Sequence, residues 1–548
     1  MILSPRSIRQ VLEISAVNGL LSILLTGSLC AADCDSPLAA QAVPSAIMTD
    51  PLIQRAVQLK AFDDFKLLMD RVRRPYVHGA LSAHLQIQRQ AQKIGVQEGE
   101  VAKIRFLVEQ LYESKSELLP VSDPLTMPRF TLSNNSPHKG AFDYIEATWQ
   151  KLIRQTPLRK ESTLIPLPNP ILIPGARFQE AYYWDSYFAM HALIRTGREK
   201  FVRGQIDNFL FLINKYGLVP NGNRDYYLSR SQPPLLSRMV RLYLHEKKDG
   251  LNSDDRAWLR NHVLPTLKRD YFGFWMNSGT RLHAATGLNH HWDAQNEPRP
   301  ERHAADIEEQ LGATYRDVRA EAESGRDFTA AYEGEATQTA TVFLNALMYG
   351  LENDLAWFSE LAGDTVGAFG FRAAMQKRKR AIQQHLYDPE TDFYYHYNLR
   401  EKRRLPYVTA EVFALVYFGV LTPAEGRPLV QKAMARLQAT GGVMGSTIQS
   451  GKQWDAPFGW APDNMIAIEA LRLVGDQRGA RHLARNWVSM VDRVFGRMGT
   501  VLEKYDMIRA DAPEEAGDKY VTQQGFLWSN GVYVWILTDI LKQSLVPL

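Results

Sequence analysis

Apolar positions recur every three or four residues along much of the chain, a spacing typical of amphipathic helices. In residues 341–363 they share one helical face and are Leu344, Leu347, Met348, Leu351, Leu355, Phe358 and Leu361. Gly363 predicts the end of this helix, because glycine readily adopts the left-handed backbone of a helix C-terminus. The same pattern predicts helices over 204–216 before Gly217, over 408–420, over 463–474 before Gly475, and over 531–542.

Alternation of apolar and polar residues, which marks strands, is nearly absent. The predicted helices are instead separated by loops rich in Trp, Tyr, Asn, Asp and Arg, and such loops carry function when a rigid scaffold presents them. We therefore expect an all-α fold. No Pro- or Ser-rich linker divides the chain after residue 140, so residues 141–548 are predicted to form one domain, with residues 33–140 as a helical extension packed on it.

Composition and charge are those of an ordinary globular protein. The 548 residues are 45% hydrophobic and 23% charged, which argues against a disordered or fibrous chain. The net charge of +4 comes from 64 basic and 60 acidic residues. This small excess argues against a nucleic-acid binder, which usually concentrates positive charge on one face.

The first 32 residues have the layout of a secretory signal peptide. Arg6 and Arg9 precede the short apolar run at residues 19–25 and then small residues, so cleavage is predicted after Ala31 or Ala32. Export to the periplasm or outside the cell is expected. The run is well short of the roughly 20 residues that span a bilayer, so no membrane anchor is expected. The alternative is an amphipathic helix, which Glu13 favours.

Only two cysteines are present. Cys30 would leave with the signal peptide and Cys34 would remain alone. A single thiol cannot form an internal disulfide, so the mature fold depends on its hydrophobic core.

The stretch PGARFQEAYYWDSY at residues 174–187 is unusually dense in both polar and aromatic side chains. Three charged residues as close together as Arg177, Glu180 and Asp185 are not expected in a hydrophobic core. They are expected in a pocket for a neutral, hydroxyl-rich molecule, because charged groups bind hydroxyls directionally and aromatic faces cover the apolar side of a sugar ring. The stretch predicts one wall of a sugar site, with Glu180 and Tyr187 bracing it from behind.

This stretch resembles the first signature of the trehalases, and QWDAPFGWAP at 453–462 matches their second. The resemblance continues, in the order the family uses, through PNGNRDYYLSRSQPP at 220–234, EPRPE at 297–301, YRDVRAEAESGRDF at 315–328, LEKYD at 502–506 and GFLWSNGV at 525–532. It implies an (α/α)6 toroid of two concentric helical rings with the sugar pocket at one end. It also implies hydrolysis of α,α-trehalose to two glucose molecules, with inversion and without a metal.

Such chemistry needs one carboxylic acid to protonate the leaving oxygen and one carboxylate to activate a water molecule on the opposite face of the sugar. By resemblance, Asp327 is the general acid and Glu503 the general base. From spacing alone, a helix cap or a surface carboxylate is the better explanation of Asp327, and an exposed partner of Lys504 is the better explanation of Glu503; the resemblance reverses this preference.

The resemblance also implies ten substrate-binding residues: Arg177, Trp184, Asp185, Asn221, Arg230, Ser231, Gln232, Arg299, Glu301 and Gly325. The alternative for the three arginines is structural ion pairing with acids such as Glu180 and Asp185. Three tryptophans of these motifs are explained equally well by core packing and by sugar contact: Trp454, Trp460 and Trp528. For Asp455, a hydrogen bond that braces a loop is as good an explanation as sugar contact.

Several positions depart from the family pattern. Arg326 stands where a tryptophan is usual, Ala331 replaces an arginine, and Phe343 replaces an aspartate. Lys519, with Asp518 beside it, stands where the family has a glutamate shortly before residues 525–532, and Ala176 replaces a glycine. If Arg326 pointed towards Asp327, its charge would lower the pKa of the acid and oppose its role; the side chain could instead turn into solvent.

No metal or other cofactor is expected. The cluster of His283, His290, His291 and His303 lacks a recognised ligand spacing, and the chain has no phosphate-binding GxxxxGK[ST] loop. We expect a monomer that binds a disaccharide and no nucleic acid. The departures leave two alternatives to trehalose hydrolysis: a glycosidase of the same fold acting on another α-glucoside, and a sugar-binding protein that has lost turnover.

Overall fold

The computed structural model describes residues 47–73, 81–113, 118–121, 128–157, 162–175, 177–247, 250–308, 314–514 and 521–548. The predicted signal peptide, Cys34, Ala176, Asp518 and Lys519 lie outside these residues.

The two clearest periodic segments form the predicted helices. α14 (Val342–Ala362) and α8 (Glu199–Tyr216) end at Gly363 and Gly217, whose φ angles of 80° and 82° are left-handed. The Thr341 hydroxyl oxygen begins α14 by accepting a hydrogen bond from the backbone amide of Leu344 at 3.2 Å. Such a cap satisfies a donor that the first helical turn leaves unpaired.

Three predicted helices differ in their bounds. α18 (Ala461–Leu473) starts two residues early, and the segment at 408–420 is only a 3-10 turn, η7 (Ala410–Phe413), followed by α16 (Ala414–Tyr417). Gly419, with φ of 81°, turns the chain away soon after α16. α20 (Leu527–Trp535) begins before residue 531 and continues as the π-helical η8 (Ile536–Ile540). Every residue of α20 is buried, so apolar periodicity does not mark its start.

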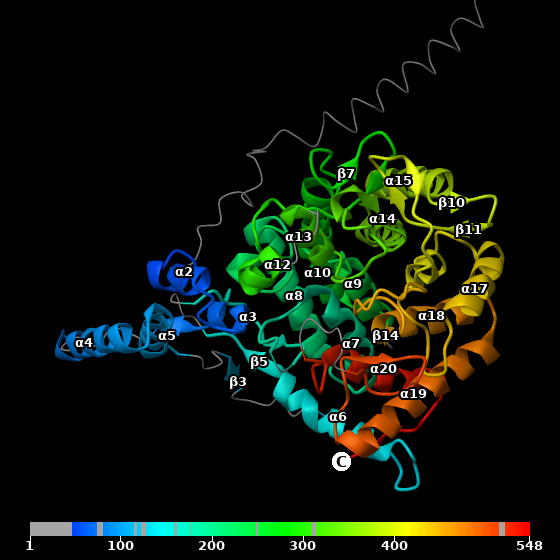
Figure 1. Cartoon of the computed structure of the whole chain (residues 1–548). Coiled ribbons are helices and arrows are strands. Elements are labelled where there is room, and N and C mark those ends of the chain that lie inside the picture. The colour runs from blue at the N-terminus through cyan, green and yellow to red at the C-terminus, as the bar shows by residue number, and fades with distance from the viewer. Residues whose placement is uncertain are drawn as a thin grey trace, which may run out of the picture.

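The helices form two concentric rings. In the part of the chain that the structure describes, six inner helices each contact the next, and the last contacts the first: α7 (Tyr183–Arg195), α9 (Leu236–His245), α14, α16, α18 and α20. An outer helical segment precedes each of them: α6 (Lys139–Leu152), α8, the run α10 (Ser253–Trp258), η3 (Leu259–Val263), α11 (Leu264–Asp270) and η4 (Tyr271–Trp275), then α15 (Thr365–His385), α17 (Pro423–Leu437) and α19 (Gln477–Met498). The predicted (α/α)6 toroid is confirmed (Figure 1).

Short helices occupy the loops between the rings: η2 (Asp225–Tyr227), η5 (Pro300–Arg302), α12 (His303–Glu308), α13 (Tyr315–Glu323) and η6 (Ala336–Gln338). The described helices before α6 are α2 (Pro51–Gln58), α3 (Phe65–Met69), α4 (Leu81–Gln97) and α5 (Glu100–Leu111). Figure 1 shows the α4–α5 hairpin projecting from one side of the toroid, with α3 between it and the rings. α3 contacts η5, which brings this N-terminal segment to the loops at one end of the toroid.

The described strands are two or three residues long and pair antiparallel. They are β1 (Val72–Arg73), β2 (Tyr112–Glu113), β3 (Leu119–Pro120), β4 (Phe130–Thr131), β5 (Ile153–Gln155), β6 (Ile171–Leu172), β7 (Leu282–His283), β8 (Leu288–Asn289), β9 (Thr339–Ala340), β10 (Tyr387–Asp388), β11 (Phe393–Tyr394), β12 (Tyr397–Asn398), β13 (Arg403–Arg404), β14 (Phe458–Trp460), β15 (Lys504–Asp506) and β16 (Val546–Pro547). The pairs are β1–β2, β3–β5–β6, β4–β16, β7–β8, β9–β12–β13, β10–β11 and β14–β15. In β14–β15, Trp460 lies opposite Lys504, which sets the second signature beside Glu503.

Candidate active site

A cavity of about 630 Å³ is lined by loops at one end of the toroid and by residues around the start of α3. This volume lies within the usual range for a small-molecule site. Both predicted catalytic carboxylates, Asp327 and Glu503, line it. So do nine of the ten predicted binding residues: Arg177, Trp184, Asp185, Asn221, Arg230, Gln232, Arg299, Glu301 and Gly325.

Asp327 lies in the loop after α13, and the second signature holds the backbone at Asp327 and at the residue that follows it. The Gln453 side-chain amide donates to the Asp327 carbonyl at 3.2 Å, and the Trp454 backbone amide donates to the Phe328 carbonyl at 3.2 Å. Phe328 has a φ of 71°, an uncommon conformation for a residue with a side chain. Asp327 is therefore held in a constrained loop and does not cap a helix.

The setting of Asp327 suits a proton donor. Its side chain lines the cavity and is 33% exposed, and protein covers the rest of it. Burial raises its pKa above the ordinary value, and the nearby Arg299 guanidinium, 3.9 Å from Oδ2, acts in the opposite direction. Burial has the larger effect, because removing the carboxylate from water penalises its charged form.

Glu503 lies immediately before β15 and is almost fully buried, with 1% of its surface exposed. The backbone amide of Gln523 donates to Glu503 Oε2 at 3.2 Å, and the Glu503 amide donates to the Gln523 carbonyl at 2.9 Å. Lys504 Nζ is 4.0 Å from Oε2 and is itself fully buried, where it donates to Gln453 Oε1 at 3.1 Å. Glu503 is therefore a carboxylate oriented at the cavity wall, and not a surface partner of Lys504.

Asp185 and Trp184 lie in the first turn of α7. Burial, followed by the charges of Glu503 and Asp327, raises the pKa of Asp185 well above its ordinary value. Trp184 packs against Gly325, where an added Cβ would lie only 2.7 Å from the indole. Since Gly325 also has a φ of 71°, both its conformation and this close approach require glycine.

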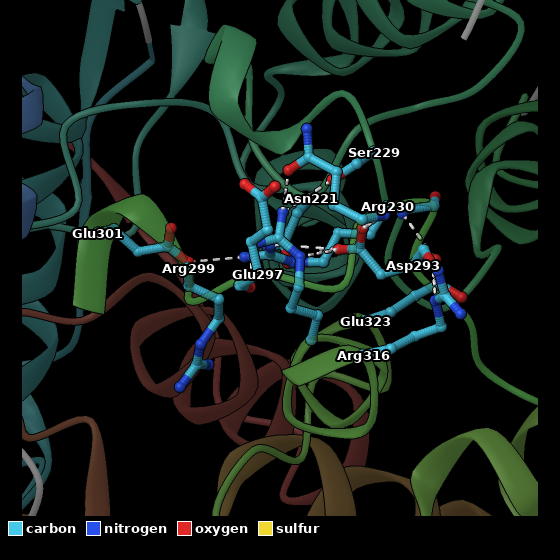
Figure 2. Close-up of polar contacts among 12 residues, drawn as sticks. Asn221, Ser229, Arg230, Asp293, Glu297, Arg299, Glu301, Arg316 and Glu323 are labelled. Atoms are coloured by element: carbon cyan, nitrogen blue, oxygen red, sulfur yellow. Dashed lines mark hydrogen bonds and ion pairs between the residues drawn. The ribbon is translucent and has the colours of Figure 1, made fainter. Parts of the chain in front are cut away.

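Arg230 is the centre of a buried polar network (Figure 2). Its Nε donates to Asn221 Oδ1 at 3.0 Å, its Nη2 donates to Glu301 Oε1 at 2.7 Å, and Asp293 lies 3.5 Å from Nη1. Asp293 also pairs with Arg319 at 2.9 Å. These contacts orient three of the predicted binding residues along one side of the cavity.

The ion-pair partners of the other two predicted arginines are not those proposed from the sequence. Arg177 pairs with Asp64 at 2.9 Å, and Arg299 pairs with Asp306 at 2.7 Å. Glu180, fully buried, is occupied by Lys66 and Arg224 behind the cavity wall. Arg177 and Arg299 are therefore ion-paired and also line the cavity.

Ser231 does not line the cavity. Its hydroxyl donates to the Val219 carbonyl at 2.5 Å and its amide donates to Glu323 at 2.9 Å, so it fixes the loop behind Arg230. Asp455 likewise braces a loop: it accepts hydrogen bonds from the Thr329 hydroxyl and the Ala330 amide, both at 2.8 Å.

The three tryptophans have different places. Trp454 and Trp460 stack on each other at 4.2 Å in the core, away from the cavity lining. Trp528 lines the cavity and donates from Nε1 to the Glu503 carbonyl at 2.9 Å. Only Trp528 of these three is placed to cover a sugar.

Arg326 points neither towards Asp327 nor into solvent. Its guanidinium is buried and pairs with Asp463 at 2.6 and 3.0 Å and with Glu411 at 3.4 Å, and it lies over the Phe343 and Trp454 rings. The cavity side of Asp327 is therefore free of this charge. The geometry removes the reason to expect that Arg326 disables the acid.

Several cavity residues were not predicted: Asp63, Asp64, Phe65, Lys66, Phe178, Tyr182, Tyr227, Arg302, Phe328, Gln523 and Phe526. Some of them stand inside the motifs quoted above, so the motifs could have identified them as cavity residues: Phe178, Tyr182, Tyr227 and Phe328. The Asp63–Lys66 group stands far outside those motifs, and nothing in its own spacing indicates the site.

Within the described residues, no three His, Cys, Asp or Glu side chains are arranged to hold a metal ion. None of the described helices combines the length and the apolar character required to cross a membrane.

Comparison with known proteins agrees with the fold and the motifs. The family model named Trehalase matches residues 60–540. The periplasmic trehalase of Xanthomonas campestris pv. campestris is 36% identical over 423 residues, covering 72% of both chains, and that of Pseudomonas aeruginosa is 36% identical over 424 residues, covering 72% of this chain and 75% of the relative.

Solved structures give the same result. The neutral trehalase of Saccharomyces cerevisiae superposes with a TM-score of 0.60 at 29% identity, covering 67% of this chain and 73% of the other. The mannosylglycerate hydrolase of Thermus thermophilus, solved with glucose, shares the fold with a TM-score of 0.51 at 16% identity, covering 72% of this chain and 99% of the other.

Proposed function

Because the chain belongs to the trehalase family and hydrolyses trehalose, we propose that Asp327 is its general acid and Glu503 its general base, in an inverting reaction. One observation carries this assignment: the two carboxylates, 176 positions apart in the sequence (503 − 327), line one cavity among the predicted sugar-binding residues.

Asp327 protonates the oxygen between the two glucose rings as the bond from that oxygen to the anomeric carbon breaks. The raised pKa supports this role, since a buried acid keeps its proton at higher pH than an exposed one. Glu503 removes a proton from the attacking water, whose oxygen forms the new bond from the opposite face. The Gln523 amide fixes the orientation of that carboxylate.

The remaining cavity residues bind the hydroxyls. Arg177, Arg230 and Arg299 present donors whose geometry is held by carboxylate partners, and Trp528 offers an aromatic face. Pre-oriented donors lose little conformational entropy when the sugar binds.

The catalytic assignment predicts that Asp327→Asn and Glu503→Gln each lower kcat on trehalose by at least about 100-fold, because each removes a proton-transfer step. Glucose release from the purified mature chain, starting at Asp33, measures this. Maltose and kojibiose run in parallel test the alternative of another α-glucoside.

The anomers give a second readout. Inversion converts the attacked ring to β-glucose while the other ring leaves as α-glucose, so NMR of fresh product should show the two anomers in equal amounts. Two α anomers would indicate retention and would contradict the role of Glu503. A near-wild-type rate in either variant, with an unchanged Tm, would reject the assignment of that residue.

Export completes the proposal. The relatives named periplasmic trehalase and the signal-like first 32 residues support a periplasmic or secreted enzyme. We propose separately that it acts as a monomer. Cell fractionation with glucose release as the readout tests the location, and light scattering of the purified chain tests the oligomeric state.

A further inference from the structure

The N-terminal segment supplies part of the cavity wall. Asp63, Asp64, Phe65 and Lys66, around the start of α3, line the cavity beside residues of the toroid loops. Phe65 is buried against the loop that carries Arg299 and Glu301, with its ring 6.4 Å from that of His303. A segment distant in sequence thus reaches the predicted sugar-binding arginines.

A buried charge cluster fixes α3 in place. Lys66 pairs with Glu180 at 2.8 Å and with Asp70 at 2.6 Å, while Arg224 pairs with Glu180 at 3.0 Å and with Asp70 at 3.1 Å. Two cations and two carboxylates leave the cluster neutral. Breaking a buried pair is costly because it leaves an uncompensated charge, so α3 is held firmly against the first signature.

Asp64 stands two residues before Lys66 and faces the cavity. Its Oδ1 accepts hydrogen bonds from Arg177 Nη2 at 2.9 Å and from the Leu67 backbone amide at 3.2 Å. The side chain is 34% exposed, and among the described residues no hydrogen bond to Oδ2 is formed. One oxygen therefore orients an arginine while the other is available to a ligand.

The loop of Arg177 is also connected to the proposed base. The Arg177 backbone amide donates to Gln523 Oε1 at 3.2 Å, and the Gln523 amide donates to Glu503. Asp64 therefore lines the same cavity, and its hydrogen bonds among the described residues go to Arg177 and Leu67 rather than to either catalytic carboxylate.

We propose that Asp64 is a specificity-determining residue of the sugar site, where it holds the Arg177 guanidinium towards the cavity and accepts a hydroxyl hydrogen bond from the bound disaccharide through Oδ2. The inference rests on the proposed function and adds the N-terminal segment to the sugar-binding wall. A carboxylate with a free acceptor oxygen beside an oriented arginine recognises a pair of neighbouring hydroxyls.

The test is Asp64→Asn in the full mature chain. Asparagine is also a good helix cap, so the bond to Leu67 can persist and α3 should remain folded. Loss of the charge weakens both the Arg177 pair and the sugar contact. We expect KM for trehalose to rise about 10-fold while kcat changes less than about 3-fold, since the hydrogen bonds of Asp64 within the described chain are with Arg177 and Leu67 and not with Asp327 or Glu503.

Glu100→Gln is the matched control. It removes a carboxylate from another arginine pair of the N-terminal segment, Arg55–Glu100, which is exposed and does not line the cavity. Its KM and Tm should stay at the wild-type values. Asp64→Glu, which keeps the charge, should recover part of the lost affinity.

An unchanged KM in Asp64→Asn would overturn the proposal, as would equal effects of Asp64→Asn and Glu100→Gln. A fall in Tm without a change in KM would also overturn it, because it would assign Asp64 a purely structural role. If the wild-type chain releases no glucose, the proposed function fails. Calorimetric binding of trehalose to the wild type and to Asp64→Asn then tests Asp64 separately, and equal affinities would reject it.

Discussion

The protonation of Asp327 results from opposing effects on one carboxyl. Burial favours the neutral acid, while the positive charges of Arg299 and then Arg302 favour the carboxylate. Arg299 also holds the loop through Asp306, so its removal would disturb more than the charge. Arg302 lines the cavity, lies over the Phe328 ring at 4.5 Å, and contacts Asp306 at 3.4 Å against 2.7 Å for Arg299, so its charge can be altered with less disturbance of the loop.

Arg302→Gln should therefore raise the pKa of Asp327. The general acid must be protonated in the free enzyme, so kcat/KM falls as the pH rises through this pKa. Removing a nearby positive charge moves that alkaline limb to higher pH, by about 0.5 pH unit. The pH profile of kcat/KM on trehalose measures the shift.

The control for this experiment is Arg436→Gln, which removes the same charge outside the cavity lining, where the exposed Arg436 lies over the Phe393 ring. Its profile should match that of the wild type. A limb that moves to lower pH in Arg302→Gln, or that moves equally in both variants, would be inconsistent with Asp327 as the titrating acid.

At the level of elements, the inner ring closes where α20 lies against α7. Gly531 permits this approach: a Cβ placed there would lie 2.5 Å from Ala189 Cα and 2.7 Å from the Phe188 carbonyl. Backbone atoms cannot move aside as a flexible side chain can, so the two helices would have to separate. The cavity depends on this contact because Asp185 lies on α7 and Trp528 on α20.

Gly531→Ala should lower the free energy of unfolding by about 1–3 kcal/mol, the usual cost of overpacking a core. Gly496→Ala is the matched control, because Gly496 lies exposed inside α19 and an added Cβ there would have no atom within 4 Å. There alanine should stabilise by about 0.5–1 kcal/mol through its better helix propensity. Urea unfolding measures both, and a stabilising Gly531→Ala would refute the close-contact argument.

On the scale of the whole molecule, the N-terminal segment and the toroid share a second hydrophobic core. It joins residues of α2, α3 and α5 to three tyrosines of the toroid loops, Tyr182, Tyr226 and Tyr227. Two of these tyrosines, Tyr182 and Tyr227, line the cavity. The segment therefore covers apolar surface that the toroid loops would otherwise expose, and it completes the site from outside the rings.

A chain that begins at residue 128 should lose both stability and substrate affinity compared with one that begins at residue 47. We expect a Tm at least ~5 °C lower, because the exposed tyrosines and the broken buried ion pairs both cost free energy. KM for trehalose should rise at least about 10-fold with the loss of Asp64 and Lys66. Equal Tm and KM in the two chains would mean that the segment is dispensable.

Much of the fold could be predicted from local pattern. The helical period of α14 and the glycines that end α8 and α14 depend on residues close together in the chain. A single sequence is therefore enough to predict them. The start of α20 could not be predicted, since a helix buried on every face has no polar side to mark its period.

The sequence by itself determined the helical class, the family signatures and nine predicted sugar-binding residues that do line the cavity, because these depend on residue type and order along the chain. Only the tertiary structure decided where the charges point. Arg326 turns to Asp463, 137 residues away, and Arg177 meets Asp64, 113 residues before it. Such partners are selected by the packing of distant elements around buried charge, and no local spacing encodes that choice.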